Sequence, residues 1–318
     1  MTAQSTNRGD GIDSERFDRI RAGMSERTKG RKTMMGRRVR EVGAACRRPR
    51  WAARALVVGL ALATLAPVGP AAAARVAVHS AAGANPASIQ AAVEACRADL
   101  GALNPNVAGS LGSGRREINW DGVPDAFAAP NPLPADFFNA NSPRGAVFST
   151  PGGGVQVSAN AANPTGTPVE FGNLNPTYPD LFRTFSPQRL FTALGSNVLD
   201  VHFFVPGSST PAVVGGFGAV FTDVDRAGSA TLEFFDPRGK SLGIFRAPVG
   251  ANGGLSFVCA TGFPLKKHGQ GGIARVRITS GTAALGPGVD ETGNTDLVAL
   301  DDFIYGEPQA FEPTGNQR

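Results

Sequence analysis

The side chains of this sequence best suited to chemistry are aspartates that follow or interrupt apolar runs. In residues 216–225, strand alternation places Asp223 and Asp225 on the same face as the preceding phenylalanines. In a second run near the C-terminus, Asp301 and Asp302 are neighbours, so on a regular strand they would point to opposite faces. Whichever face is buried, one carboxylate is drawn toward it. An unpaired buried charge is costly, so these acids need partners.

Two kinds of partner would satisfy them. Arg275 and Arg277 alternate on a predicted strand and could pair with the acids of the second run, while those of the first run would cap a turn. The alternative is a hard cation, because Ca²⁺ takes about six to eight oxygens, which aspartates at strand ends supply. Residues 290–296 (DETGNTD) are also rich in oxygen but lack EF-hand spacing. The calcium hypothesis has four candidate ligands: Asp223, Asp225, Asp301 and Asp302.

Signatures of nucleophilic or zinc chemistry are missing from the sequence. There are three histidines and no G-x-S-x-G motif, and only His202 alternates with an acid, Asp200, as expected for a polar pair on a strand surface. Cys96 and Cys259 have no neighbouring histidine pair to complete a zinc site, and whether they form a disulfide stays open. A catalytic carboxylate pair of the glycosidase type remains an alternative.

Aromatic side chains give a second kind of candidate site. Carbohydrate-binding proteins commonly present an exposed tryptophan or tyrosine ring as a platform. Tyr178 lies in a proline-rich segment, residues 175–179, and is the better surface candidate. A Tyr178 ring packed over proline is the alternative, and Trp120, which closes a predicted strand, is favoured as a core residue. The candidate glycan contacts are therefore Tyr178 and, as the second choice, Trp120.

The elements that must position these side chains are short strands. The 318 residues include 41 glycines and 24 prolines, a share that excludes a coiled coil or helical bundle. Turn residues separate runs with β-type alternation, with no helical pattern between them, so the sequence predicts an all-β, antiparallel sandwich. The runs are residues 116–120, 146–150, 155–159, 168–171, 198–205, 212–222, 230–235, 242–246, 255–260, 273–279 and 297–305.

One short α-helix precedes the sandwich. Asn85-Pro86 is a start signal, apolar residues then recur at helical spacing, and Gly101 is a stop signal. We expect this helix and a linker to occupy residues 75–113. The β-sandwich domain is predicted at residues 114–308, and residues 309–318 form a tail.

The N-terminal region has the order of an export signal. Residues 1–75 hold 16 Lys/Arg against 6 Asp/Glu, whereas residues 76–318 hold 15 against 20. An apolar run at 55–66 and small residues at 71–74 follow the basic part, which predicts a signal peptide at 47–74 and a secreted or periplasmic product without a membrane span. Residues 1–46 form a basic disordered extension or precede the true start. The lack of interleaved aromatics argues against nucleic-acid binding.

Five segments together resemble a group of uncharacterised secreted bacterial proteins. The resemblance covers about residues 89–308 and implies a jelly-roll sandwich and export, with no activity assigned. Some members carry a PEP-CTERM sorting tail, for which the last residues here, QAFEPTGNQR, have no counterpart. The segments are GRREINWDG, GFGAVFTDVD, the predicted hairpin EFFDPRGKSLGIF, ARVRITSG and VALDDFIYGEP.

These observations predict an exported, non-catalytic binding or structural module that contacts a glycan or another envelope component. Long loops on a sandwich without a nucleophile motif favour this function. The alternative is a polysaccharide-acting hydrolase or lyase on the same scaffold. The ligand and the oligomeric state are not specified by the sequence.

Overall fold

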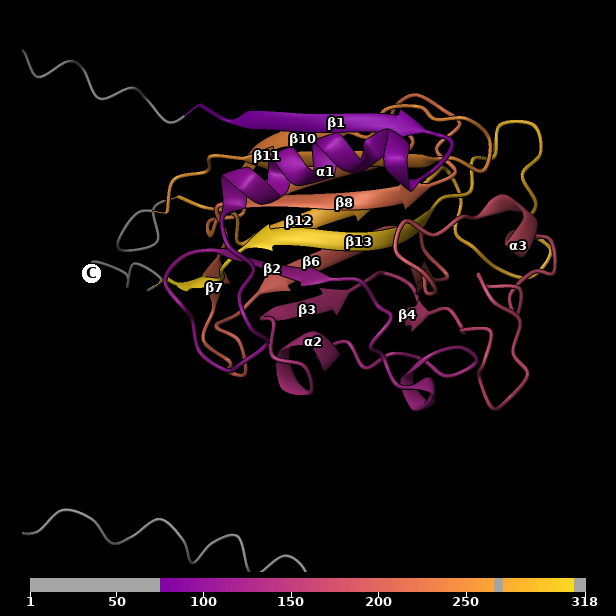
Figure 1. The fold of residues 1–318 in the computed structure, drawn as a ribbon, viewed down its shortest axis with the longest axis horizontal. Helices are drawn as coiled ribbons and strands as arrows, with labels where there is room; N and C mark the ends of the chain where they lie inside the picture. Colours follow the sequence, from indigo (N-terminus) through magenta and orange to yellow (C-terminus); the bar gives the residue numbers. More distant parts are fainter. Residues whose placement is uncertain (1–74, 266–270, 312–318) are drawn as a thin grey trace, which may run out of the picture. The chain divides into compact units, whose positions relative to one another are not determined.

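The structure, a computed structural model, describes residues 75–265 and 271–311, which form two antiparallel sheets packed face to face (Figure 1). The export signal predicted at 47–74 lies outside the described residues. The strand order of the first sheet is β1 (Ala77–Gly83), β11 (Leu255–Thr261), β8 (Gly216–Thr222), β13 (Ala299–Gly306), β5 (Phe191–Leu194) and β4 (Gly154–Val157). In that sheet β2 (Arg115–Ile118) also pairs with β13.

The second sheet has the order β10 (Ser241–Arg246), β9 (Thr231–Phe235), β12 (Arg275–Thr279), β6 (Val198–Phe203) and β3 (Ala146–Ser149). A short pair, β7 (Ala212–Val213) and β14 (Gln309–Ala310), stands apart from both sheets. Between β8 and β13 the chain passes repeatedly from one sheet to the other, as in a jelly roll. The predicted all-β sandwich preceded by a short helix is confirmed.

Burial explains why these residues form strands. In β6, buried and partly exposed residues alternate, because one face of the second sheet meets the core and the other meets solvent. By contrast, every residue of β8 and β11 is buried. Helix α1 (Pro86–Leu100) lies on the outer face of the first sheet and covers these strands (Figure 1). The central strands β8, β11 and β13 of the first sheet are therefore buried on both faces.

Helix α1 is fixed to the sheet by apolar packing and a covalent bond. Asn85 caps the helix by accepting a hydrogen bond from the Ser88 backbone N–H. Ile89 and Val93 are fully buried against β8, β11 and β13, and Cys96 forms a disulfide with Cys259 of β11. The other helices, α2 (Phe137–Ala140), α3 (Tyr178–Leu181) and the 3₁₀ turn η2 (Asp125–Phe127), are single turns. Of the helices in the described part, none has the length and apolarity to cross a membrane.

The sandwich starts earlier than the sequence predicted. Strand β1 precedes α1 and pairs with β11 from Ala77 opposite Thr261 to Gly83 opposite Leu255. Residues 75–113 were predicted to hold only a helix and a linker, whereas Ala77–Gly83 form this strand. Residues 168–171, predicted as a strand, form only an isolated bridge between Val169 and Ala159, followed by a turn in which Glu170 and Phe171 have positive φ angles of 49° and 63°.

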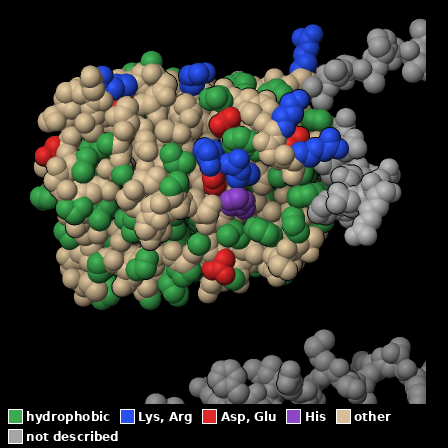
Figure 2. Space-filling view, turned by 180° about the vertical axis from the view of Figure 1, so that it is seen from behind, with side chains coloured by type: hydrophobic (Ala, Val, Ile, Leu, Met, Phe, Trp, Pro, Cys, Tyr) green, Lys and Arg blue, Asp and Glu red, His purple; other side chains and the backbone are tan. Residues whose placement is uncertain are grey.

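The outer face of the second sheet carries a compact polar group. Figure 2 shows basic, acidic and histidine side chains gathered near the middle of the face opposite α1. There Arg275 donates to Asp200 at 2.8 Å and Arg277 donates to both of its carboxylate oxygens. His202 contacts the Ser149 hydroxyl at 3.0 Å. The two arginines therefore pair with Asp200 and leave the C-terminal aspartates without the partners that the sequence suggested.

Candidate metal centre

The first predicted ligand, Asp223, lies at the point where β8 ends. Its backbone N–H donates to the Gly254 carbonyl at 2.8 Å, and its φ angle of 69° turns the chain out of the strand. The Gly253 N–H donates to Asp223 Oδ1 at 2.6 Å. The other carboxylate oxygen, Oδ2, is buried in a residue that is 0% exposed, and it has no hydrogen-bond partner within the described part of the chain. One oxygen of this buried carboxylate is therefore left unpaired there.

Two further carboxylates face the same point. One oxygen from each of Asp223, Asp225 and Glu291 lies within 4.8 Å of the other two. We call these three residues the acidic triad. Glu291 comes from the segment between β12 and β13, where it accepts a hydrogen bond from the Leu297 N–H at 3.0 Å. The triad thus joins the end of β8 to a loop about seventy residues further along the chain.

A fourth acid holds the triad's backbone in place. Asp296 is buried, and its two carboxylate oxygens accept hydrogen bonds from the backbone N–H groups of Asp225 and Arg226, at 3.2 and 3.1 Å. The Asp296 N–H in turn donates to the Thr282 hydroxyl at 2.9 Å. Asp296 therefore acts by positioning the turn that carries Asp225.

The electrostatics of the triad disfavour three free carboxylates. Burial, followed by the charges of Glu291 and Asp225, raises the pKa of Asp223 to about 7. Burial is also the main cause that raises the pKa of Glu291 and of Asp225, with smaller contributions from neighbouring acids. Like charges at this separation repel, and either protons or a cation relieves the repulsion. The donor set is all oxygen, so the triad could hold a metal ion, and a hard one is favoured.

Asp301 and Asp302 are not part of this group. The pairing of β13 with β8 shifts register between Leu300 and Phe303, which marks a bulge containing both aspartates. Ser186 Oγ reaches Asp302 Oδ1 at 2.6 Å and Asp301 Oδ1 at 3.4 Å. The prediction that the two acids point to opposite faces is therefore wrong, because the bulge brings both carboxyls to one hydroxyl.

The two neighbouring aspartates are shielded from solvent, and in the described part of the chain neither forms an ion pair. Asp301 and Asp302 are almost fully buried, and the Phe185 N–H donates to Asp301 Oδ2 at 2.6 Å. Burial raises the pKa of Asp302 to about 6, and burial together with Asp302 raises that of Asp301 well above its usual range. They form a second buried acidic pair, separate from the triad.

The predicted aromatic platforms are core residues. Trp120 is 1% exposed, stacks on Phe191 with ring centroids 4.0 Å apart, and donates its indole N–H to the Asp301 carbonyl at 2.9 Å. Tyr178 is fully buried, and its hydroxyl donates to the Val289 carbonyl at 2.9 Å. Neither ring forms the exposed platform that the sequence suggested. Tyr178 instead ties α3 to the loop that carries Glu291.

Sequence reasoning missed Glu291 as a ligand. It lies in the oxygen-rich segment 290–296, which was set aside because its spacing differs from an EF-hand. The clue in the sequence that could have indicated Glu291 is that this segment directly precedes the strand that contains Asp301 and Asp302. Comparisons of the chain with protein-family models, with curated proteins and with solved structures found no significant match.

Proposed function

We propose that this protein is an exported β-sandwich module that binds Ca²⁺ at the acidic triad and acts by binding or structural support, with no catalytic role for the ion. The observation that carries the proposal is the buried Asp223 carboxylate: its Oδ2 has no hydrogen-bond partner among the described residues, and one of its oxygens lies within 4.8 Å of oxygens of Asp225 and Glu291. A divalent cation would satisfy this oxygen and neutralise its neighbours.

The chemistry of the triad supports calcium over other divalent ions. Zinc sites favour histidine and cysteine ligands, and neither is present among these three residues. Mg²⁺ demands near-octahedral geometry, whereas Ca²⁺ accepts irregular sets of carboxylates, backbone carbonyls and water. Asp225 and Glu291 are only partly buried, which leaves room for water to complete the ligand set. Calcium sites of extracellular modules have Kd values of about 10⁻⁴ to 10⁻³ M.

Two features support export. The apolar run at residues 55–66 with small residues after it has the form of a signal. The Cys96–Cys259 disulfide is of a kind that persists in oxidising compartments. A cation that joins β8 to the 281–297 segment would stabilise one end of such a sandwich.

Thermal unfolding of the full chain in EDTA and in millimolar Ca²⁺ tests the proposal. At a hundredfold excess over Kd, binding to the folded state alone contributes about 2.7 kcal/mol, which raises the midpoint by a few degrees. Mg²⁺ at the same concentration should raise it less. An unchanged midpoint in Ca²⁺ would refute the calcium site.

Asp223→Asn is the informative variant. It keeps the side-chain shape and removes the charge, so we expect a higher midpoint than wild type in EDTA and no response to Ca²⁺. Asp136→Asn makes the same change at an exposed aspartate whose side chain makes no capping hydrogen bond, and it should respond like wild type. A full calcium response in Asp223→Asn would contradict the calcium site at the triad. Protons shared among the three carboxylates would then be what relieves their repulsion.

A further inference from the structure

A cleft of about 490 Å³ opens between α1 and the segments that follow β2 and precede β5. A second cavity of about 320 Å³ lies next to it, since Asn119 and Arg144 line both. Each volume is in the range of small-ligand sites. None of the triad residues lines either cavity, so this cleft is separate from the proposed metal site.

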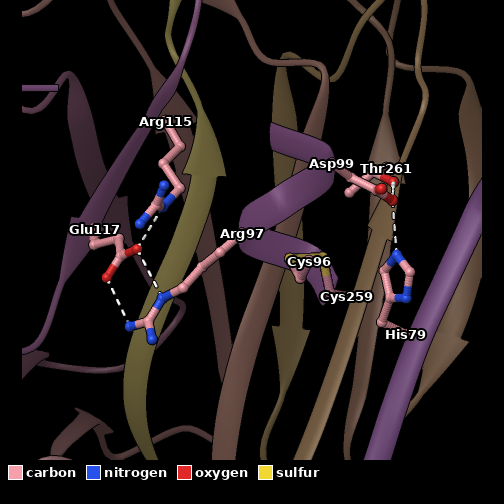
Figure 3. The surroundings of a disulfide bond; sticks show 8 residues. All are labelled: His79, Cys96, Arg97, Asp99, Arg115, Glu117, Cys259 and Thr261. Carbon is pink, nitrogen blue, oxygen red and sulfur yellow. Dashed lines mark hydrogen bonds and ion pairs between the residues drawn. A yellow bond between two sulfur atoms is a disulfide. The ribbon is translucent and has the colours of Figure 1, made fainter. Parts of the chain in front are cut away.

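One wall of the cleft is rigid and charge-balanced. Arg97 of α1 donates to both carboxylate oxygens of Glu117, at 3.0 and 2.9 Å, and Arg115 donates to the same carboxylate at 2.6 Å (Figure 3). The disulfide at Cys96, next to Arg97, ties this part of the helix to the sheet. Glu117 is therefore neutralised by two arginines, and the wall is fixed without a ligand.

Arg144, at the junction of the two cavities, is different. Its Nε donates to the Glu117 backbone carbonyl at 2.9 Å, one Nη group donates to the Ser142 hydroxyl, and its guanidinium stacks over Phe138 at 5.2 Å from the ring centroid. Within residues 75–265 and 271–311 no carboxylate forms an ion pair with it, and its Nη2 makes no hydrogen bond. Burial lowers the pKa of this guanidinium. Arg144 is thus a half-buried, oriented cation with one donor edge free.

Most of the other polar side chains that line the cleft are uncharged, and Asp302 is the exception. Gln90, Asn104, Asn106 and Asn119 offer amides, and Ser186 offers a hydroxyl. These groups both donate and accept, as the hydroxyls of a sugar require. The second cavity adds apolar side chains, among them Phe127 and Phe137, which suit the C–H faces of sugar rings. Asp302, 3% exposed, lies at the floor of the polar cavity.

We infer that this cleft binds an acidic oligosaccharide, with the sugar's anionic group on the free edge of Arg144 and its hydroxyls on the surrounding amides. An arginine fork matches a carboxylate or sulfate in two parallel hydrogen bonds, and a free guanidinium edge in a polar cleft favours such a group. The inference rests on the binding role in the proposed function, to which it adds a class of ligand, and it does not depend on calcium.

Calorimetric titration of the full chain with a trigalacturonate and with the neutral galactose trimer tests the inference. We expect the acidic trimer to bind at least about tenfold more tightly, since hydrogen bonds to charged groups contribute about 1.5–3 kcal/mol. A sulfated galactose trimer, run in parallel, distinguishes carboxylate from sulfate as the anionic group. Equal affinity for neutral and acidic trimers, or no binding of any trimer, would overturn the inference.

Variants locate the site. Arg144→Gln should lose the preference for acidic trimers, whereas Arg246→Gln, which removes a charge from the exposed end of β10, should retain it. Asn119→Ala, at an exposed residue shared by both cavities, should weaken binding of every trimer and keeps the test decisive if Arg144→Gln does not fold. Wild-type affinity in both cleft variants would place the ligand elsewhere.

The metal-site variant separates this inference from the calcium proposal. Asp223→Asn should bind the acidic trimer as wild type does, because its side chain does not line the cleft. Loss of the calcium response with retained trimer binding supports both proposals. Trimer binding by a wild-type protein that does not respond to calcium would refute the metal site alone.

Discussion

Removal of the Cys96–Cys259 bond should cost a large part of the stability of this sandwich. The bond joins α1 to the buried strand β11 across a sequence separation of 163 residues. In the chain-entropy account, cross-linking a loop of this length restricts the unfolded chain by about 5 kcal/mol. Measured values for native disulfides are typically about 2–5 kcal/mol, so we expect the free energy of unfolding to fall by that amount.

Urea unfolding of the full chain with and without reductant measures this loss. Reduction leaves both sulfur atoms in the core, so it changes the cross-link without opening a cavity. With an m-value near the upper end for small domains, about 3 kcal/mol per molar urea, the midpoint should fall by about 0.7–1.7 M. The double variant Cys96→Ala/Cys259→Ala should lose more, because both side chains are fully buried and their removal also leaves space.

Cys46→Ser provides the control background, because it leaves only the two paired cysteines. The unfolded, unreduced protein should then show no reactive thiol, and the reduced protein should show two. If the bond is present by this titration and reduction shifts the free energy of unfolding by less than about 1 kcal/mol, the loop-entropy reasoning fails for this chain.

Two further predictions concern buried charge. Glu307→Ala should lower the free energy of unfolding in urea by about 3–5 kcal/mol, because Arg116 and Glu307 are almost fully buried and pair at 2.5 Å. Glu94→Ala removes an exposed partner of Arg97 and should lower it by less than about 1 kcal/mol. Similar losses in the two variants would contradict the difference expected between a buried and an exposed ion pair. Burial raises the pKa of Asp302 to about 6 in the folded state, so the stability that its protonated side chain contributes is complete below about pH 4 and is lost as pH rises through 6. In EDTA between pH 4 and 6, the free energy of unfolding should fall more steeply for wild type than for Asp302→Asn, by up to about 1.4 kcal/mol per pH unit. Parallel plots of unfolding free energy against pH would argue against a raised pKa.

The sequence predicted the strands in which one face is buried and the other is not. Residues 198–205 alternate cleanly and contain β6, because period-two burial leaves a period-two pattern. Strand β1 escaped prediction since its sequence, AVHSAAG, contains mostly small residues and depends on pairing with β11 for its structure. Residues 191–194 were also not predicted as a strand, and they form β5 beside β13 because of contacts with strands distant in the sequence.

The candidate sites were harder to predict than the strands. Asp223 and Asp225 were recognised because two acids continue an apolar row, but Glu291 reaches them only through the three-dimensional path of the 281–297 segment. The bulge that turns Asp301 and Asp302 toward Ser186 leaves no mark in the sequence. The cleft around Arg144 combines α1, β2 and the segments before β3 and β5, so no local motif could have indicated it.

Asp223 combines two costs at one residue. Its φ angle of 69° lies in the left-handed region, which aspartate tolerates better than most residues but which still carries strain. Its Oδ2 is also buried without a partner, which costs free energy in any folded protein. The left-handed turn brings the Asp223 carboxylate to the oxygens of Asp225 and Glu291. The proposed calcium ion would offset both costs, since it binds the unpartnered oxygen and converts the repulsion among three carboxylates into attraction.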